Sequence, residues 1–141
     1  MTGGGTVMTI EEIRGIEDGK GGLHQLLGMH TINVDEEGRF SLEVKVTQQL
    51  LNPFGIVHGG TIFTLCDTAV GTYVAYGKRR AVTLDGAIHY YRPGMPESTL
   101  RAIVKERKSG RTMGKFLVEV FDDKDNHIAD ATFTMYYTDQ K

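Results

Sequence analysis

Apolar residues follow two different spacings along this chain, and each spacing predicts a different kind of element. Apolar and polar side chains alternate over five stretches, which is typical of half-buried strands; these stretches are residues 40–47, 82–91, 99–107, 112–122 and 127–137. The same alternation begins at Met29, which allows a sixth strand. Turn-forming residues at 108–110 and 122–126 predict antiparallel hairpins, and those at 35–38 predict a turn.

One long segment, Gly60–Tyr76, is apolar on almost every side. A helix with this pattern is normally surrounded by other structure rather than lying on a surface. A shorter helix is expected after Thr9, because Thr9 and Glu12 fit a capping box. The expected apolar face of that helix is Ile10, Ile13 and Ile16. Glycines within 19–22 should end it, and residues 23–27 should form one further helical turn.

Together these elements predict the α+β class, with one curved antiparallel sheet of five or six strands wrapped around a long central helix. An open sheet leaves edge strands, and the pairing of two copies through such an edge is a natural way to cover it. Residues 1–8 are expected to be a flexible N-terminal leader, and residues 9–141 a single domain.

Charge and cysteine content narrow the classes of function. The formal net charge is −2 and the pI is about 6.2, so nothing favours binding to nucleic acid or to an anionic membrane. No apolar run approaches the ~18 residues that a membrane span needs, and the N-terminus has no signal-peptide pattern. The single cysteine, Cys66, permits no internal disulfide. We therefore expect a cytoplasmic protein without nucleic-acid or membrane partners.

The most informative stretch is the glycine-rich loop 52–60, which leads directly into the long apolar helix. A helix N-terminus carries unpaired N–H groups and positive dipole, so the amide of Gly59 could stabilise a developing oxyanion. Asp67 follows two turns later among apolar neighbours. The pattern predicts an acyl-transfer site in which Gly59 and Asp67 act on one carbonyl carbon. The alternative is a structural carboxylate paired with one of the basic residues after the helix: Lys78, Arg79 and Arg80.

Other nucleophiles and metal sites find no support in the residue pattern. Cys66 adjoins Asp67 but points about 100° away around the helix, so we expect a buried small hydrophobe. The serines lie in no Gly-x-Ser-x-Gly setting, which argues against a serine hydrolase. The five histidines show no metal-ligand spacing, and we assign no metal.

Asn52, Gly55 and the run Val57–Gly60, followed by Asp67, resemble the motif of the hotdog-fold acyl-CoA thioesterases. The subgroup that the chain resembles is typified by the phenylacetate-pathway and 4-hydroxybenzoyl-CoA thioesterases. The resemblance extends in element order over residues 23–138.

The resemblance implies a homodimer, often paired again into a tetramer, with the active sites between subunits. It implies that Asp67 activates water or attacks the thioester directly, while the Gly59 amide forms the oxyanion hole. Asn52 would orient the water or the thioester. Thr83, reaching across from the partner chain, would hold the water, and His58 would fix the loop through a local hydrogen bond.

The resemblance also implies an acyl-CoA substrate and no separate cofactor, since coenzyme A is part of the substrate. Candidate substrate-binding residues at the motif and on the following strand are Gly60, Phe63 and Tyr90. The strand face that carries Thr83, with Asp85, Ala87, His89 and Tyr91, is expected to border the acyl pocket. The coenzyme phosphates would rest on basic residues that could otherwise form a plain solvated turn: Arg107, Lys108 and Arg111.

Two other functions remain open at this level. One is a hotdog dehydratase or hydratase that uses a His58–carboxylate pair on an acyl thioester. The other is a non-catalytic module that binds acyl-CoA. The residues also leave open the acyl group, the role of Asp67 as nucleophile or base, and the choice between dimer and tetramer.

Overall fold

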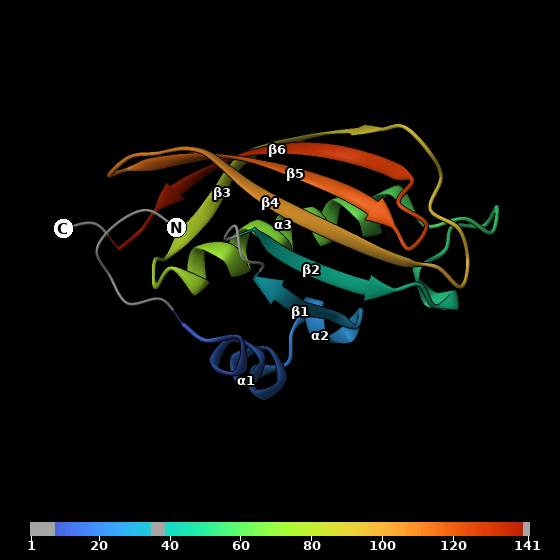
Figure 1. The fold of residues 1–141 in the computed structure, drawn as a ribbon, viewed down its shortest axis with the longest axis horizontal. Helices are drawn as coiled ribbons and strands as arrows, with labels where there is room; N and C mark the ends of the chain where they lie inside the picture. Colours follow the sequence, from blue (N-terminus) through green and yellow to red (C-terminus); the bar gives the residue numbers. More distant parts are fainter. Residues whose placement is uncertain (1–7, 35–38, 140–141) are drawn as a thin grey trace.

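The computed structural model describes residues 8–34 and 39–139, and the side chains at 16–20 and 32–34 lie outside that description. Its elements are α1 (Ile10–Lys20), α2 (Leu23–Leu26), β1 (Met29–Val34), β2 (Phe40–Lys45), a 3₁₀ turn (Gln48–Leu50), α3 (Gly59–Tyr76), β3 (Ala81–Tyr90), β4 (Thr99–Ser109), β5 (Met113–Asp122) and β6 (His127–Tyr137). Six antiparallel strands and one long central helix form the α+β arrangement that the sequence predicts (Figure 1).

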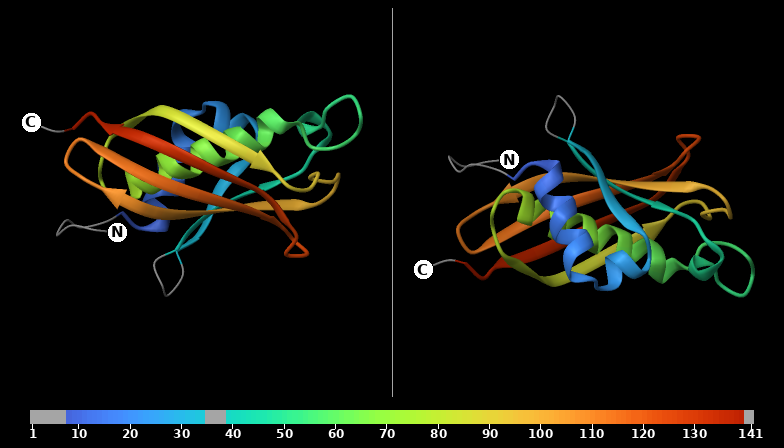
Figure 2. Two further views of the ribbon diagram at one scale, coloured as in Figure 1. Left: turned by 90° about the horizontal axis from the view of Figure 1, so that it is seen from above. Right: turned by 90° about the horizontal axis from the view of Figure 1, so that it is seen from below.

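The strands lie in the order β1-β2-β4-β5-β6-β3, so β1 and β3 are the edges of the sheet. Both predicted hairpins are confirmed, since β4 pairs with β5 and β5 with β6 in antiparallel register. The predicted turn at 35–38 lies outside the described residues. Helices α1 and α2 contact β1 at one edge of the sheet, whereas β3 borders the opposite edge (Figure 2).

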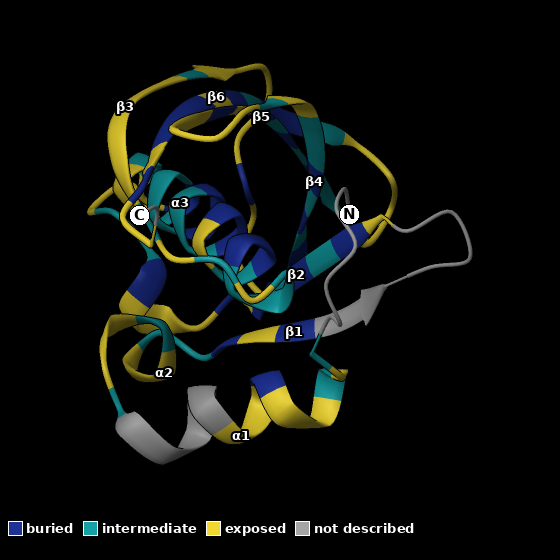
Figure 3. Ribbon diagram, turned by 90° about the vertical axis from the view of Figure 1, so that its left-hand side faces the viewer, coloured by how far each residue is buried: buried dark blue, intermediate teal, exposed yellow. Residues whose placement is uncertain are grey.

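Helix α3 runs through the concave side of the curved sheet (Figure 3). Its fully buried side chains lie on one face at i, i+3, i+4 spacing, and most of the other positions are half-buried rather than exposed. The buried residues are Ile62, Leu65, Cys66, Ala69, Val70, Tyr73 and Val74. Burial of a Val, Leu or Ile side chain contributes roughly 1.5–3 kcal/mol, so the packing of α3 against the sheet stabilises the fold substantially. None of the described helices has the length and apolarity that crossing a membrane requires.

The N-terminal helix begins at the predicted capping box. The Thr9 side chain accepts from the Glu12 amide, and the Glu12 side chain accepts from the Thr9 amide. Ile13 is buried on the core side of α1. Met8 already contacts the body of the protein, because its amide donates to the carbonyl of Tyr76. The rest of the predicted leader lies outside the described residues.

A bulge in β3 changes which side chains share a face. Thr83 lies opposite Met135 and Asp85 lies opposite Thr134, so Leu84 is the extra residue. Beyond the bulge, Gly86 lies opposite the buried Phe133. The prediction that Thr83 shares a face with the following odd-numbered residues is therefore wrong. An extra residue shifts the period-two alternation by one position, which puts Gly86, Ile88 and Tyr90 on the helix side instead.

Candidate functional site

The loop before α3 is organised by one side chain. Asn52 accepts from two backbone amides through Oδ1, those of Phe54 at 2.9 Å and Ile56 at 3.3 Å. Its carbonyl also accepts from Gly55, whose φ of +82° is one that glycine adopts without strain. Since Oδ1 is used in the loop, the Nδ2 amino group of Asn52 is the part of the side chain that remains for a ligand.

The first turn of α3 has one amide with no acceptor. His58 is the N-cap, and its Nδ1 accepts from the Gly60 amide at 2.8 Å. An accepting Nδ1 places the imidazole proton on Nε2. The carbonyl of Gly59 accepts from the Tyr90 hydroxyl at 2.7 Å. The Gly59 amide itself donates to no group in the described part of the chain, which leaves it available to an oxygen of a ligand.

Asp67 lies in the third turn of α3 and is half-buried. Its Oδ1 accepts from the Thr83 hydroxyl at 2.6 Å, a short charge-assisted hydrogen bond. The prediction that Thr83 holds the water from a partner chain is wrong about the chain, because β3 returns along α3 and brings Thr83 to the Asp67 of its own chain. The alternative pairing with the basic residues also fails for Arg79, which pairs with Asp139 at 3.0 Å.

The amide of Gly59 and the carboxylate of Asp67 do not meet within one chain. They are eight residues apart on the same helix, and a rise of about 1.5 Å per residue separates them by about 12 Å along the axis. A thioester group is far shorter than that. The expectation that the two groups act on one carbon is therefore wrong for a single chain, since it treats nearness in sequence as nearness in space.

A cavity of about 350 Å³ opens beside the start of α3. Its lining is mostly apolar and includes Asn52, Ile56, Val57, Gly59, Ile62, Tyr90 and Arg92. Three of the predicted site residues therefore line one cavity: Asn52, Gly59 and Tyr90. A small-molecule site usually combines such an apolar wall with a few polar groups.

Phe63, a predicted substrate-binding residue, and Cys66 do not line this cavity. The ring of Phe63 contacts that of Phe133, with centroids 5.4 Å apart. Cys66 is fully buried, which confirms the expected small hydrophobe. Burial, together with the charges of Asp130 and Asp67, raises the pKa of its thiol. A thiol held in its neutral form is a poor nucleophile.

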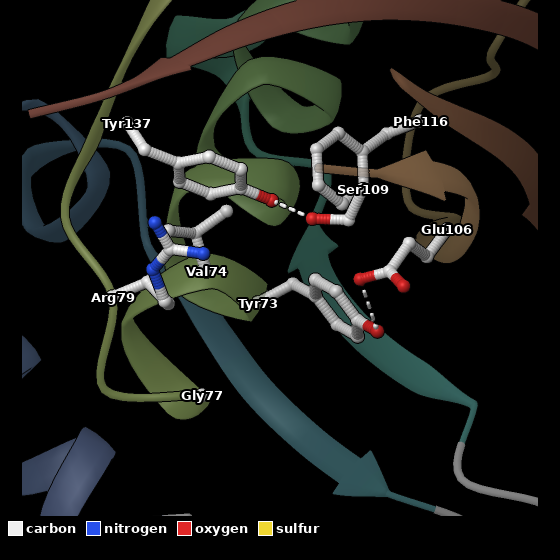
Figure 4. A pocket seen from close by; sticks show the side chains of 8 residues that line it. All are labelled: Tyr73, Val74, Gly77, Arg79, Glu106, Ser109, Phe116 and Tyr137. Carbon is white, nitrogen blue, oxygen red and sulfur yellow. Dashed lines mark hydrogen bonds between the residues drawn. The ribbon is translucent and has the colours of Figure 1, made fainter. Parts of the chain in front are cut away.

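A second, smaller cavity of about 40 Å³ lies at the other end of α3 (Figure 4). The Tyr73 hydroxyl donates to Glu106 at 3.4 Å there, and the hydroxyls of Ser109 and Tyr137 hydrogen-bond to each other. Arg79 lies over the ring of Tyr137, 3.8 Å from its centroid. The space suits about one water molecule, and none of the predicted site residues lines it.

The predicted docking residues Arg107, Lys108 and Arg111 are exposed and lie near this second end of α3. The Arg79 guanidinium there donates to the Arg111 carbonyl at 3.4 Å. Since α3 has 18 residues, about 26 Å of helix separates this end from Gly59. The structure therefore does not bring the basic residues to the cavity of the same chain.

The described residues contain one group with ligand atoms close enough for a metal ion. Glu119, His127 and Asp130 have such atoms within 4.8 Å of one another. Sequence spacing missed this group because Glu119 and Asp130 are neighbours only through the pairing of β5 with β6. The carboxylates are already engaged, Glu119 with Lys105 and Asp130 with His127, both at 2.5 Å. We therefore assign no ion to the group.

Known proteins resemble this chain over most of its length. The acyl-coenzyme A thioesterase PaaI of Escherichia coli K12 is 32% identical over 103 residues, which are 73% of each chain. The solved structure of the E. coli PaaI protein superposes with a TM-score of 0.83 at 25% identity, covering 94% of this chain and 95% of that one. The structure of smu.793 from Streptococcus mutans bound to acetyl CoA has a TM-score of 0.74 and 32% identity, covering 81% and 91%.

The family model of the thioesterase superfamily matches residues 54–129, more than half of the chain. The match begins in the loop before α3 and ends in β6, so it includes Gly59, Asp67 and Thr83. The curved six-stranded sheet around one central helix is the architecture of the matched structures as well. The chain therefore belongs to the thioesterase superfamily and has its hotdog fold.

Proposed function

We propose that this protein is an acyl-CoA thioesterase, which hydrolyses a thioester to the free acid and coenzyme A. The observation that carries the proposal is the Asp67 carboxylate, held by Thr83 on a helix whose N-terminal amide at Gly59 has no acceptor in the described chain. Support comes from the name of the E. coli relative and from neighbours solved with coenzyme A and with acetyl CoA. The compartment we infer is a reducing one, consistent with a single buried cysteine.

The active site in this proposal is built from two copies of the chain. Edge strand β3 carries Tyr90, bonded to Gly59, near one end and Thr83, bonded to Asp67, near the other. Antiparallel pairing of β3 with its copy about a two-fold axis at Ala87 would set Tyr90 opposite the partner's bulge at Thr83 and Leu84. The partner's Asp67 would then lie beside this Gly59, which removes the 12 Å separation.

The same pairing would bring a second feature to the cavity. The partner's end of α3, with its basic hairpin, would approach the cavity beside Gly59. Arg107, Lys108 and Arg111 would then serve the neighbouring chain's substrate rather than their own. Their positive charge would meet the coenzyme phosphates at the mouth of the site. Solution mass measurements distinguish such a dimer from a tetramer of paired dimers.

The chemistry needs few groups because a thiolate leaves readily. Asp67 takes a proton from water, whose oxygen attacks the thioester carbon, or Asp67 attacks that carbon itself and water then hydrolyses the resulting anhydride. In either route the C–S bond breaks as the carbonyl re-forms, and coenzyme A leaves as a thiolate that takes up a proton. The Gly59 amide stabilises the oxyanion, a contribution typically worth ~3 kcal/mol. Asn52 contributes its Nδ2 group to hold the thioester or the water. His58 acts only as the helix cap.

Mixed dimers test this proposal directly. Asp67→Asn removes the base, and Gly59→Pro removes the amide. The backbone accepts proline at the first position of the helix after the extended His58, but the added Cβ, 3.1 Å from the Tyr90 hydroxyl, also displaces that ring slightly. Each variant alone should lose ~10²–10³-fold in thiol release from acyl-CoA. When the two variants are dissociated and mixed, one of the two sites in each mixed dimer is intact, so about a quarter of the wild-type rate should return.

Failure of the mixture to recover activity, with both variants folded and dimeric, would exclude a shared site. The assay also separates the two alternatives. A dehydratase would form an enoyl thioester without releasing thiol, and it would need a free His58, whereas Nδ1 is occupied as a cap. A binding module would take up acyl-CoA and release no thiol across aryl, short, medium and long acyl groups.

A further inference from the structure

The amide of Gly59 lies in a backbone segment that is held by several hydrogen bonds, one of them from the His58 amide to the Leu50 carbonyl at 2.9 Å. Three further short ones act on the two peptide groups that Gly59 shares. The carbonyl of His58, in the same peptide group as this amide, accepts from Thr61 at 2.9 Å. The next peptide group is held at its N–H end by His58 Nδ1 at 2.8 Å and at its carbonyl end by the Tyr90 hydroxyl at 2.7 Å. Glycine has no Cβ to restrict its backbone, so these bonds decide where the amide points.

Tyr90 differs from the other two partners because it comes from another element. The bonds of Thr61 and His58 are local to the first turn and would move with it. Tyr90 lies at the end of β3, 31 residues away, and ties the helix start to the sheet. A Cβ on Gly59 would lie 3.1 Å from the Tyr90 hydroxyl and 3.3 Å from its ring, so the tyrosine also packs directly against this glycine.

The Tyr90 hydroxyl is suited to remain a donor. Burial raises the pKa of this phenol, so it stays protonated through the neutral range. Its acceptor is the Gly59 carbonyl, which has no proton to donate, so the hydroxyl must be the donor of this hydrogen bond. The ring also lines the cavity beside Gly59.

We propose that Tyr90 is a positioning residue, which holds the start of α3 so that the Gly59 amide stays directed at the thioester oxygen. The inference deepens the proposed function and rests on it. Substrate would not need to touch the hydroxyl, since its effect passes through the Gly59 carbonyl. Loss of the bond would let the first turn fluctuate and would weaken stabilisation of the transition state more than binding of the substrate.

The kinetic test compares two variants that each remove one hydroxyl and one hydrogen bond. Tyr90→Phe should lower kcat about tenfold while KM changes less than about twofold. One oxyanion-hole donor typically raises kcat ~10²–10³-fold, and the variant should lose part of that rate enhancement. The matched control is Tyr73→Phe, which removes the hydroxyl that donates to Glu106 at the far end of α3 (Figure 4). That variant should keep the wild-type kcat.

A second measurement does not depend on turnover. In ¹⁵N-labelled protein, the order parameter of the Gly59 amide should fall in Tyr90→Phe and stay unchanged in Tyr73→Phe. Equal order parameters in both variants and in the wild type would overturn the inference, even if no acyl-CoA were hydrolysed. Equal kcat values for the two variants, with an active wild type, would overturn it and leave the proposed function standing.

Discussion

At the scale of single residues, the contact that matters most joins Asp67 to Thr83. The hydroxyl of Thr83 lies 2.6 Å from Oδ1 and also 3.4 Å from the sulfur of Met135. One carboxylate oxygen is therefore engaged, and in the proposed reaction Oδ2 is the oxygen left for water or for the thioester. In the proposed reaction Thr83 would act through Asp67, by its hydroxyl rather than by its methyl group.

Thr83→Val should lower kcat about tenfold, because the carboxylate loses the donor that orients it and general-base catalysis depends on that geometry. Thr83→Ser should keep most of the activity, since the hydroxyl remains. Thiol release at saturating acyl-CoA measures both. As a control, Thr132→Val changes an exposed threonine of β6 and should have no effect. A Thr83→Val variant with wild-type kcat would contradict this role.

At the scale of elements, the bulge in β3 and the packing of α3 decide the shape of the site. Without the extra residue at Leu84, Thr83 and Tyr90 would lie on opposite faces of the strand, and one of them would point away from the helix. Gly86 lies between them, opposite Phe133. A Cβ at Gly86 would come within 2.6 Å of the Phe133 ring and 3.0 Å of the Phe63 ring, so the absence of a side chain lets β3 approach the core.

Gly86→Ala should therefore destabilise the fold by ~1–3 kcal/mol, because rings held in a packed core cannot yield without strain. Gly71→Ala is the matched control within α3, since a Cβ there meets nothing within 4 Å. That change should stabilise the protein by up to ~1 kcal/mol through helix propensity. Urea unfolding measures both. Equal midpoints for the two variants would show that β3 does not pack as closely as described.

At the scale of the whole molecule, the last described residues close the chain onto the turn after α3. Asp139 accepts from the Arg79 guanidinium at 3.0 Å and from the Arg80 amide at 3.0 Å. These hydrogen bonds lower the pKa of Asp139. The folded state thus favours the ionised carboxylate, and its contribution to stability is present above the ordinary aspartate pKa and lost as pH falls through the lowered one.

Asp139→Asn should accordingly lower the melting temperature at pH 7, and the difference from the wild type should shrink as the solution is acidified through the aspartate range. Asp123→Asn serves as the control, because Asp123 is exposed in the turn between β5 and β6 and has no ion pair in the described part of the chain. If the difference in melting temperature between Asp139→Asn and the wild type did not change with pH, the charge of Asp139 would not be the source of its stabilising effect.

Local patterns were enough for the elements themselves. The predicted strand 127–137 has the same bounds as β6, and the predicted helix Gly60–Tyr76 begins one residue after α3 does. The burial of the helix also follows from its apolar sequence. The hairpin pairings follow because a short turn places two successive strands side by side. The face of β3 does not follow, since one unpaired residue in a strand leaves no mark in a period-two pattern.

The sequence by itself determined the α+β class, the start of the long helix next to Gly59, the place of Asp67 on that helix and the resemblance to a thioesterase, because each depends on neighbours along the chain. Only the tertiary structure decided that Thr83 belongs to the same chain's Asp67, that Tyr90 holds Gly59, and that Gly59 and Asp67 are too far apart to act together in one chain. Distance in space depends on how strands return past the helix, and no local spacing of residue types records that path.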